Sequence, residues 1–243
     1  MILANTRLQM TRDDAQLAVR LLARASGESV EALERRMTDE GIDAVLDDPR
    51  LAAALLKLPA GAHASLPLFA YAIIRHALRD VGEDDRGIAD YVTSLVVHFS
   101  LSGRANRIGM ADDQTYQALV DLVQDVDDPD ANRSFLVRTH LGNYALWLSG
   151  LFPDHIEQRR WRRGGPDLDY FEELGRHGFH LAAEHRLAEQ YGLATLYATA
   201  ADRFGLLRTA LNSISDSLFF PNVNTPERLM RVVRDEARWR RVS

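Results

Sequence analysis

Apolar residues recur along most of the chain with a period near 3.6, the period of an α-helix. In residues 11–25, for example, Leu17, Leu21 and Leu22 fall on one side of a helix. No segment shows the sustained two-residue alternation that is typical of strands. The pattern therefore predicts an all-α fold, a multi-helix bundle of about ten helices of which several are short. The predicted helices span 11–25, 28–40, 49–58, 66–80, 87–101, 114–126, 129–151, 153–163, 167–191, 193–218 and 226–241, with a short segment of residues 42–47 between the second and the third.

The most apolar and aromatic stretch of the chain runs from Arg138 to Phe152 and carries few charges. A helix that is apolar on all sides is buried on all sides, so we expect this segment to be the packing spine of the bundle. Gly142 and Gly150 lie within about 80° of each other on a helix. This spacing favours the close approach of a neighbouring helix, and Gly150 also suits a helix C-cap before Pro153.

The same segment contains His140, which shares a helix face with Tyr144 and lies beside Asn143. Together with His155 and the surroundings of Trp147, it is a candidate for acid–base chemistry. A buried histidine next to a tyrosine or asparagine is more often a satisfied core group than a general base. We therefore expect His140 to belong to the core.

A resemblance to a group of bacterial all-helical proteins of unknown function is carried by two strings, His140-Leu-Gly-Asn-Tyr-Ala-Leu-Trp-Leu-Ser-Gly-Leu-Phe152 and Asp167-Leu-Asp-Tyr-Phe-Glu-Glu-Leu-Gly175. In that group a Gly-Asp or Gly-Asn step leads into an aromatic helix end, and an Asp-Tyr-Tyr-like stretch follows. The resemblance covers residues 134–220, and 41–56 is similar as well. It implies a shared helical fold and no particular activity.

Chain length and segmentation predict a single helical domain of residues 1–243, in which 1–58 could form a small N-terminal subdomain. The chain contains no cysteine, which excludes disulfides, cysteine-ligated metals and thiol nucleophiles. Neither a signal peptide nor a run long enough to cross a membrane is visible, so we expect a cytoplasmic protein without membrane contact.

The net charge of −6 is unevenly distributed, with 22 acidic and 13 basic residues in 1–130 against 13 and 16 in 131–243. An acidic protein is unlike a general nucleic-acid binder. A helix–turn–helix-like pattern in 17–37 does not change this view, because its second helix is mostly acidic and would repel phosphates. Nucleic acid is therefore not the expected partner.

Four residues with metal-binding side chains, Glu173, His177, His180 and Glu184, are spaced to form one stripe on the predicted helix 167–191. Imidazoles and carboxylates suit zinc, iron or manganese, so a divalent metal is the alternative hypothesis for this stripe. The simpler interpretation is a solvated flank of Glu–His pairs. The Glu-x-x-His pairs of di-iron bundles and the His-Glu-x-x-His zinc motif are both absent.

Arginines recur every three or four residues along the final predicted helix, opposite Leu229, Val232 and Val233. Such a basic stripe could bind an acidic partner or phosphates, or pair within the protein. The candidate partner-binding residues are Arg231, Arg234, Arg238, Trp239 and Arg241.

Motifs of hydrolases and nucleotide-binding enzymes are missing from the sequence, including the nucleophile elbow, the Walker loop and the dinucleotide fingerprint. We therefore expect a non-catalytic interaction or regulatory protein without a cofactor, which associates with a protein partner or with itself. The alternative is a metal-dependent or small-molecule-binding helical enzyme that uses the Glu/His stripe.

Overall fold

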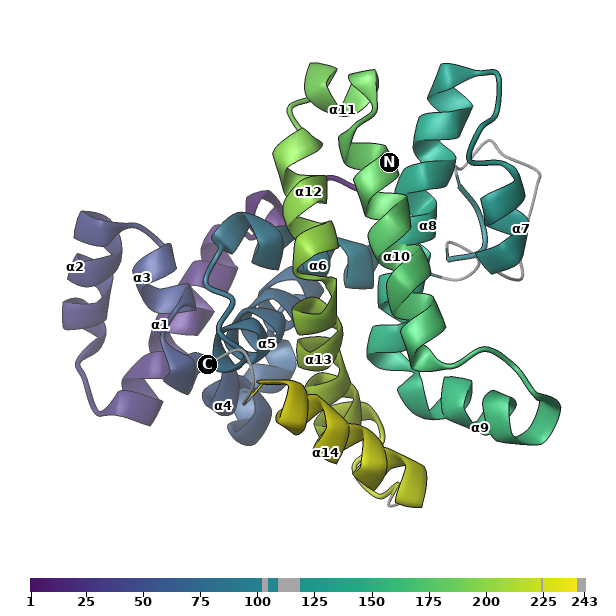
Figure 1. Ribbon diagram of the computed structural model, residues 1–243. Helices are drawn as coiled ribbons and strands as arrows, with labels where there is room; N and C mark the ends of the chain where they lie inside the picture. The colour runs from purple at the N-terminus through teal and green to yellow at the C-terminus, as the bar shows by residue number, and fades with distance from the viewer. Residues whose placement is uncertain (102–104, 109–118, 224, 240–243) are drawn as a thin grey trace. The chain divides into compact units, whose positions relative to one another are not determined.

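The computed structural model describes the chain except for residues 102–104, 109–118, 224 and 240–243, and it leaves out the side chains of 236–239. Every regular element in the described part is helical, which confirms the predicted all-α multi-helix fold (Figure 1). The chain divides into two compact units, one of residues 2–101 and one that begins at residue 102. This division lies well beyond residue 58, where the sequence pattern placed the end of a small N-terminal piece.

The N-terminal unit is a cluster of helices, most of which are capped at the start by a side chain. Thr11 and Asp14 form a capping box, and Leu17, Leu21 and Leu22 are buried as the periodicity predicts. The elements are η1 (Arg7–Gln9, a 3₁₀ turn), α1 (Arg12–Ser26), α2 (Val30–Glu40), α3 (Asp43–Leu46), α4 (Pro49–Lys57), η2 (Pro59–His63, a 3₁₀ turn), α5 (Leu66–Asp80) and α6 (Arg86–Ser100).

A buried arginine ties three elements of this unit together. Arg75 on α5 is 2% exposed and donates to Asp47, which follows α3, over 2.8 Å. Arg86, at the start of α6, pairs with the same carboxylate at 2.7 Å. Burial would raise the pKa of Asp47, but the hydrogen bonds and charges of these two arginines outweigh it and hold the pKa below its ordinary value.

The C-terminal unit is built around α8, which packs along α10 and α13 (Figure 1). Of the 21 residues of α8, 14 are buried, which confirms that this helix is the spine of its unit. The elements are α7 (Leu119–Gln124), α8 (Ala131–Leu151), α9 (Pro153–Arg163), α10 (Leu168–Ala183), α11 (Arg186–Gln190), α12 (Ala194–Asp202), α13 (Phe204–Ile214), η3 (Ser215–Phe219, a π-helical turn) and α14 (Pro226–Trp239).

Glycines allow the helices around α8 to approach closely. A Cβ atom added to Gly142 would lie 2.6 Å from the ring of Phe179 on α10, and one added to Gly150 would lie 2.7 Å from Leu211 on α13. The predicted role of Gly142 and Gly150 in close packing is thus confirmed. The C-cap of α8, however, is Phe152 rather than Gly150.

Two predicted long helices are broken in the structure. The helix expected over 167–191 ends at Ala183, because His185 adopts an extended backbone and its Nδ1 atom accepts the backbone N–H of Leu187 at the start of α11. The helix expected over 193–218 is interrupted at Arg203 and ends in the π-helical turn η3. Of the helix expected over 114–126, the structure describes only α7, since residues 109–118 lie outside the described part.

Candidate functional site at the C-terminal helix

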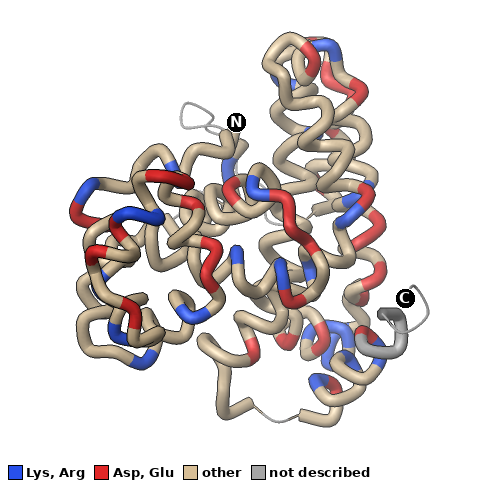
Figure 2. Tube along the Cα trace, turned by 90° about the vertical axis from the view of Figure 1, so that its left-hand side faces the viewer, with Lys and Arg blue, Asp and Glu red and all other residues tan. Residues whose placement is uncertain are grey.

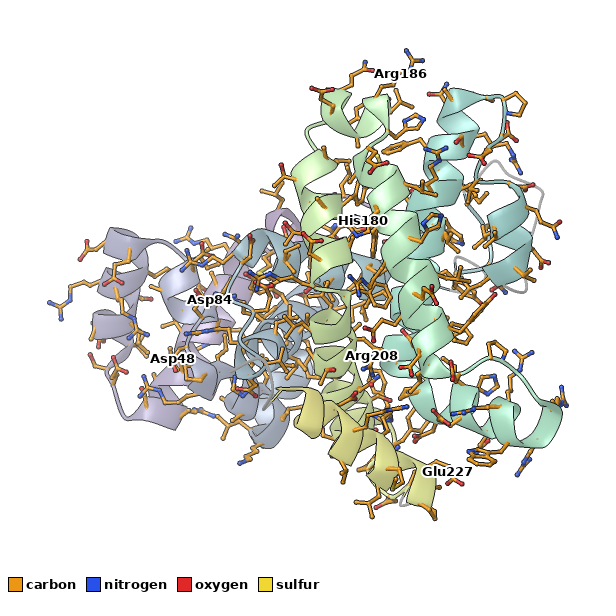
Figure 3. The ribbon with its side chains drawn as sticks, in the orientation of Figure 1. Asp48, Asp84, His180, Arg186, Arg208 and Glu227 are labelled. Carbon is orange, nitrogen blue, oxygen red and sulfur yellow. The ribbon has the colours of Figure 1, made fainter. Side chains whose placement is uncertain are left out.

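The Glu/His stripe on α10 is exposed along its whole length. Glu173, His177, His180 and Glu184 all have exposed side chains. His180, which is labelled in Figure 3, lies 3.9 Å from Asp202, and both of these side chains are exposed. Across the described residues, no three His, Cys, Asp or Glu side chains are close enough to hold a metal ion. The geometry gives the metal hypothesis no support, and metal analysis of untagged protein remains its test.

The described arginines of α14 pair within the protein, which is one of the alternatives that the sequence pattern left open. Arg231 is 2% exposed and donates to Asp216 in η3 over 2.8 Å. Arg234 is half-buried, with Glu157 at 3.9 Å and Asp169 at 4.0 Å. Carboxylates of the same unit therefore hold Arg231 and Arg234 against the protein. The side chains of Arg238 and Trp239 and the whole of Arg241 lie outside the described residues.

A further arginine, which the sequence reasoning did not single out, holds the start of α14. Arg228 is 8% exposed and donates through Nε to Asp154 of α9 over 3.0 Å. It also donates to the carbonyl oxygen of Phe220 over 2.8 Å. Its spacing of three from Arg231 was a visible hint, but its acidic partners Asp216 and Asp154 are 12 and 74 residues away in sequence and could not be paired with it from periodicity alone.

The middle of α14 is fixed by a buried ion pair with α13. Arg208 on α13 donates to Asp235 over 2.9 Å, and both side chains are buried (Figure 3). Glu172 of α10 accepts from Arg208 over 3.2 Å. Burial opposes the charge of Arg208, but the hydrogen bonds and charges of these two carboxylates outweigh it and raise its pKa above the ordinary value.

The same network reaches the C-terminal end of α8. Arg208 donates to the side-chain oxygen of Asn212 over 2.8 Å, and the amide nitrogen of Asn212 donates to the carbonyl oxygens of Ser149 and Gly150, each over 2.7 Å. The hydroxyl of Ser215 donates to the carbonyl of Leu151 over 2.7 Å. The last carbonyl groups of a helix have no partner within it, so these donors satisfy groups that would otherwise be buried and unpaired.

The opposite side of α14 is apolar and faces outward. Leu229, Met230, Val232 and Val233 are between 36% and 68% exposed. We call these four side chains the α14 outer face. Phe219 and Phe220, in the segment that leads to α14, are also exposed. The helix is thus amphipathic as predicted, but its charged side packs against the protein and its apolar side does not.

His140 lies in the core, as expected from the sequence. Its ring is buried and stacks on that of Tyr144, with the ring centroids 6.0 Å apart and an angle of 6° between the planes. Tyr144 in turn stacks on Trp147 at 6.0 Å. His155, the other member of this candidate group, is exposed on α9. The two histidines are therefore in different environments, one inside the spine and one at the surface.

Acidic and basic positions are interspersed along both units in Figure 2. None of the helices in the described part of the chain combines the length and apolar character that a membrane crossing needs. No protein-family model matches the chain, and no curated protein or solved structure matches it either. The resemblance to bacterial helical proteins of unknown function stays a prediction.

Proposed function

We propose that this protein is a non-catalytic helical interaction protein that self-associates through the α14 outer face. The observation that carries the proposal is the orientation of α14. Its arginines are directed into ion pairs with α9, η3 and α10, while Leu229, Met230 and Val233 point to solvent. A helix that packed only against its own domain would place these side chains the other way round.

Burial of the apolar side chains of the α14 outer face would drive the association. Full burial of a valine, leucine or methionine side chain contributes about 1.5–3 kcal/mol. The four side chains are about half exposed, so covering them on each of two protomers would contribute roughly 6–12 kcal/mol, against an association cost of about 4–15 kcal/mol. The face therefore supports a reversible complex rather than a permanent one.

A second copy of the chain is the partner that fits this face best. The α14 outer face is an apolar row, and Arg228 and Arg231, the charges nearest to it along the helix, are already paired with Asp154 and Asp216. A charged partner would find no counter-charge in the row itself. A two-fold related copy presents the same row, so two α14 helices can cover each other's apolar side chains.

Sedimentation equilibrium across the micromolar range tests the proposal. Wild-type protein is expected to dimerise reversibly, and the triple variant Leu229→Gln, Met230→Gln, Val233→Gln is expected to associate at least about tenfold more weakly. Leu8→Gln is the matched control, because Leu8 is a leucine of the other unit that is 86% exposed. A wild-type protein that stays monomeric, or a triple variant that dimerises like wild type, would refute the role of this face.

The absence of catalysis and the cytoplasmic location expected from the sequence remain part of this proposal. They are supported by the missing enzyme motifs and by the composition of the chain, not by a measured property.

A further inference from the structure

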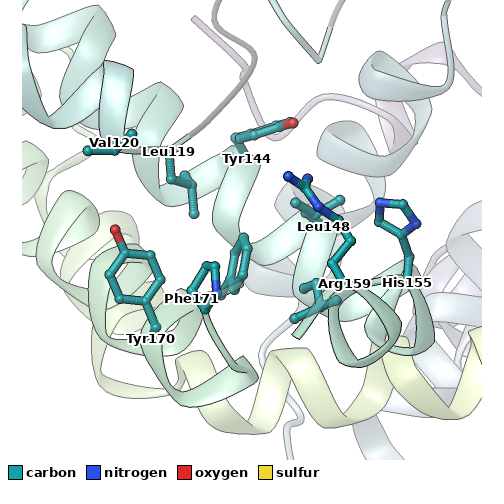
Figure 4. A pocket seen from close by; sticks show the side chains of 10 residues that line it. Leu119, Val120, Tyr144, Leu148, His155, Arg159, Tyr170 and Phe171 are labelled. Atoms are coloured by element: carbon teal, nitrogen blue, oxygen red, sulfur yellow. The ribbon is translucent and has the colours of Figure 1, made fainter. Parts of the chain in front are cut away.

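A pocket of about 340 Å³ lies in the C-terminal unit, away from the α14 outer face (Figure 4). This volume lies at the small end of the range for pockets that bind small molecules. Its walls are apolar and aromatic and come from four helices. They include Leu119 of α7, Tyr144 and Leu148 of α8, Ile156 of α9, and Tyr170 and Phe171 of α10.

One cation reaches into this pocket without a carboxylate to balance it. Arg159 of α9 lines the pocket, and within the described part of the chain no acidic side chain pairs with it. The adjacent Arg160, by contrast, pairs with Glu157 at 3.8 Å and with Asp167 at 3.9 Å. Among the described residues that line the pocket there is no aspartate or glutamate, and His155 is the other basic residue. Its polar end therefore favours an anion.

A second polar group in the pocket is also without a partner. Tyr144 is 8% exposed, and its hydroxyl forms no hydrogen bond with any described residue. The hydroxyl is therefore available to a ligand in the pocket. Burial raises the pKa of Tyr144 despite the nearby charge of Arg159, so the hydroxyl keeps its proton at neutral pH and can donate it. In Figure 4, Arg159 extends from α9 toward Tyr144, with Tyr170 and Phe171 across the pocket.

We propose that this pocket binds a small monocarboxylate with an apolar body. The apolar body would lie among Leu148, Ile156 and Phe171, and the carboxylate would accept hydrogen bonds from Arg159 and Tyr144. A guanidinium group offers two parallel N–H donors that match the two oxygens of a carboxylate. A single cation and a single hydroxyl suit one singly charged head group. This proposal is independent of self-association through α14.

The test is isothermal titration calorimetry with octanoate, octan-1-ol and octylammonium, three probes that share one tail and differ in head-group charge. Octanoate is expected to bind more tightly than octan-1-ol, and octylammonium is expected not to bind. Arg159→Gln should weaken octanoate at least about tenfold and leave octan-1-ol unchanged, because charge-assisted hydrogen bonds contribute roughly 1.5–3 kcal/mol. Tyr144→Phe should weaken octanoate about fivefold.

Arg163→Gln is the matched control, since Arg163 is on the same helix, is exposed and does not line the pocket. Circular dichroism of each variant checks that the fold is kept. The proposal is overturned if octanoate does not bind at millimolar concentration or if octylammonium binds equally well. It is also overturned if Arg159→Gln and Arg163→Gln have the same effect.

Discussion

Replacing Asn212 by alanine should destabilise the C-terminal unit strongly, although the change removes only one small polar side chain. Asn212 is buried, and its amide donates to the carbonyl oxygens of Ser149 and Gly150 at the end of α8, each over 2.7 Å. In the variant both carbonyls stay buried without a donor. A buried group left unpaired costs about 1–3 kcal/mol, so we expect a loss of roughly 2–5 kcal/mol in the free energy of unfolding.

Asn212→Asp separates the role of the amide nitrogen from that of the side-chain oxygen. The aspartate has the same shape and still accepts from Arg208, which donates to the oxygen of Asn212 over 2.8 Å in the wild type. It places a carboxylate oxygen against the two carbonyls in place of the donor. If the carbonyls matter as argued, this variant should be at least as unstable as the alanine variant.

Urea denaturation followed by tryptophan fluorescence reports on the unfolding of the C-terminal unit, because Trp147, Trp161 and Trp239 all lie in that unit. For a slope of about 2 kcal/mol per molar urea, a loss of 3 kcal/mol moves the midpoint by about 1.5 M. Asn132→Ala is the control, since Asn132 is exposed in the first turn of α8. An Asn212→Ala midpoint within experimental error of the wild type would show that water replaces the amide.

Two further predictions use the same measurement. Gly178→Ala should lower the free energy of unfolding by about 1–3 kcal/mol, because the added Cβ would lie 2.8 Å from the backbone nitrogen of Gly142. Gly205→Ala should change the free energy of unfolding by less than about 1 kcal/mol, because the added Cβ would meet only the end of the Glu172 side chain. Burial and two nearby arginines lower the pKa of His185, so the stability that its neutral form contributes is complete above about pH 6.5 and is lost as the pH falls through the folded-state pKa. His185→Asn keeps an acceptor for the N–H of Leu187, so this variant should lose less stability than wild type between pH 7 and pH 5; equal losses would contradict the argument.

Helical periodicity predicted the elements well, because each helix buries one face and the apolar residues of that face recur at 3.6 positions. It did not predict the breaks at His185 and Arg203. Neither residue is a proline or glycine, and the end of α10 depends on a histidine acting as an N-cap. The division at residue 101 was also missed. Apolar helices precede and follow it, and periodicity shows that a helix is buried without showing which helices bury it.

The ligand pocket could not be predicted from the sequence either, because periodicity does not show which helices lie together. Tyr144 lies in the segment that was predicted to be the packing spine, and its burial is compatible with that prediction, whereas Arg159 lies in the predicted helix 153–163. What the sequence could not show is that α9 brings the two side chains to one cavity. The Glu/His stripe, in contrast, could be recognised in the sequence because its members follow one predicted helix. Side chains in a row along one helix do not converge on a single metal ion unless other helices supply ligands, and among the described residues none do.

The orientation of α14 shows where amphipathicity is an incomplete guide. Periodicity separated the charged side of this helix from its apolar side correctly, but it could not show which of the two sides faces the protein. The charged side does so because the protein presents the half-buried acceptors Asp154 and Asp216 to Arg228 and Arg231. Loss of a carboxylate partner would leave a buried guanidinium group unpaired, so these ion pairs fix the rotation of α14 before any partner binds. The α14 outer face is therefore already formed in the free protein, and association through it requires no rearrangement of the helix.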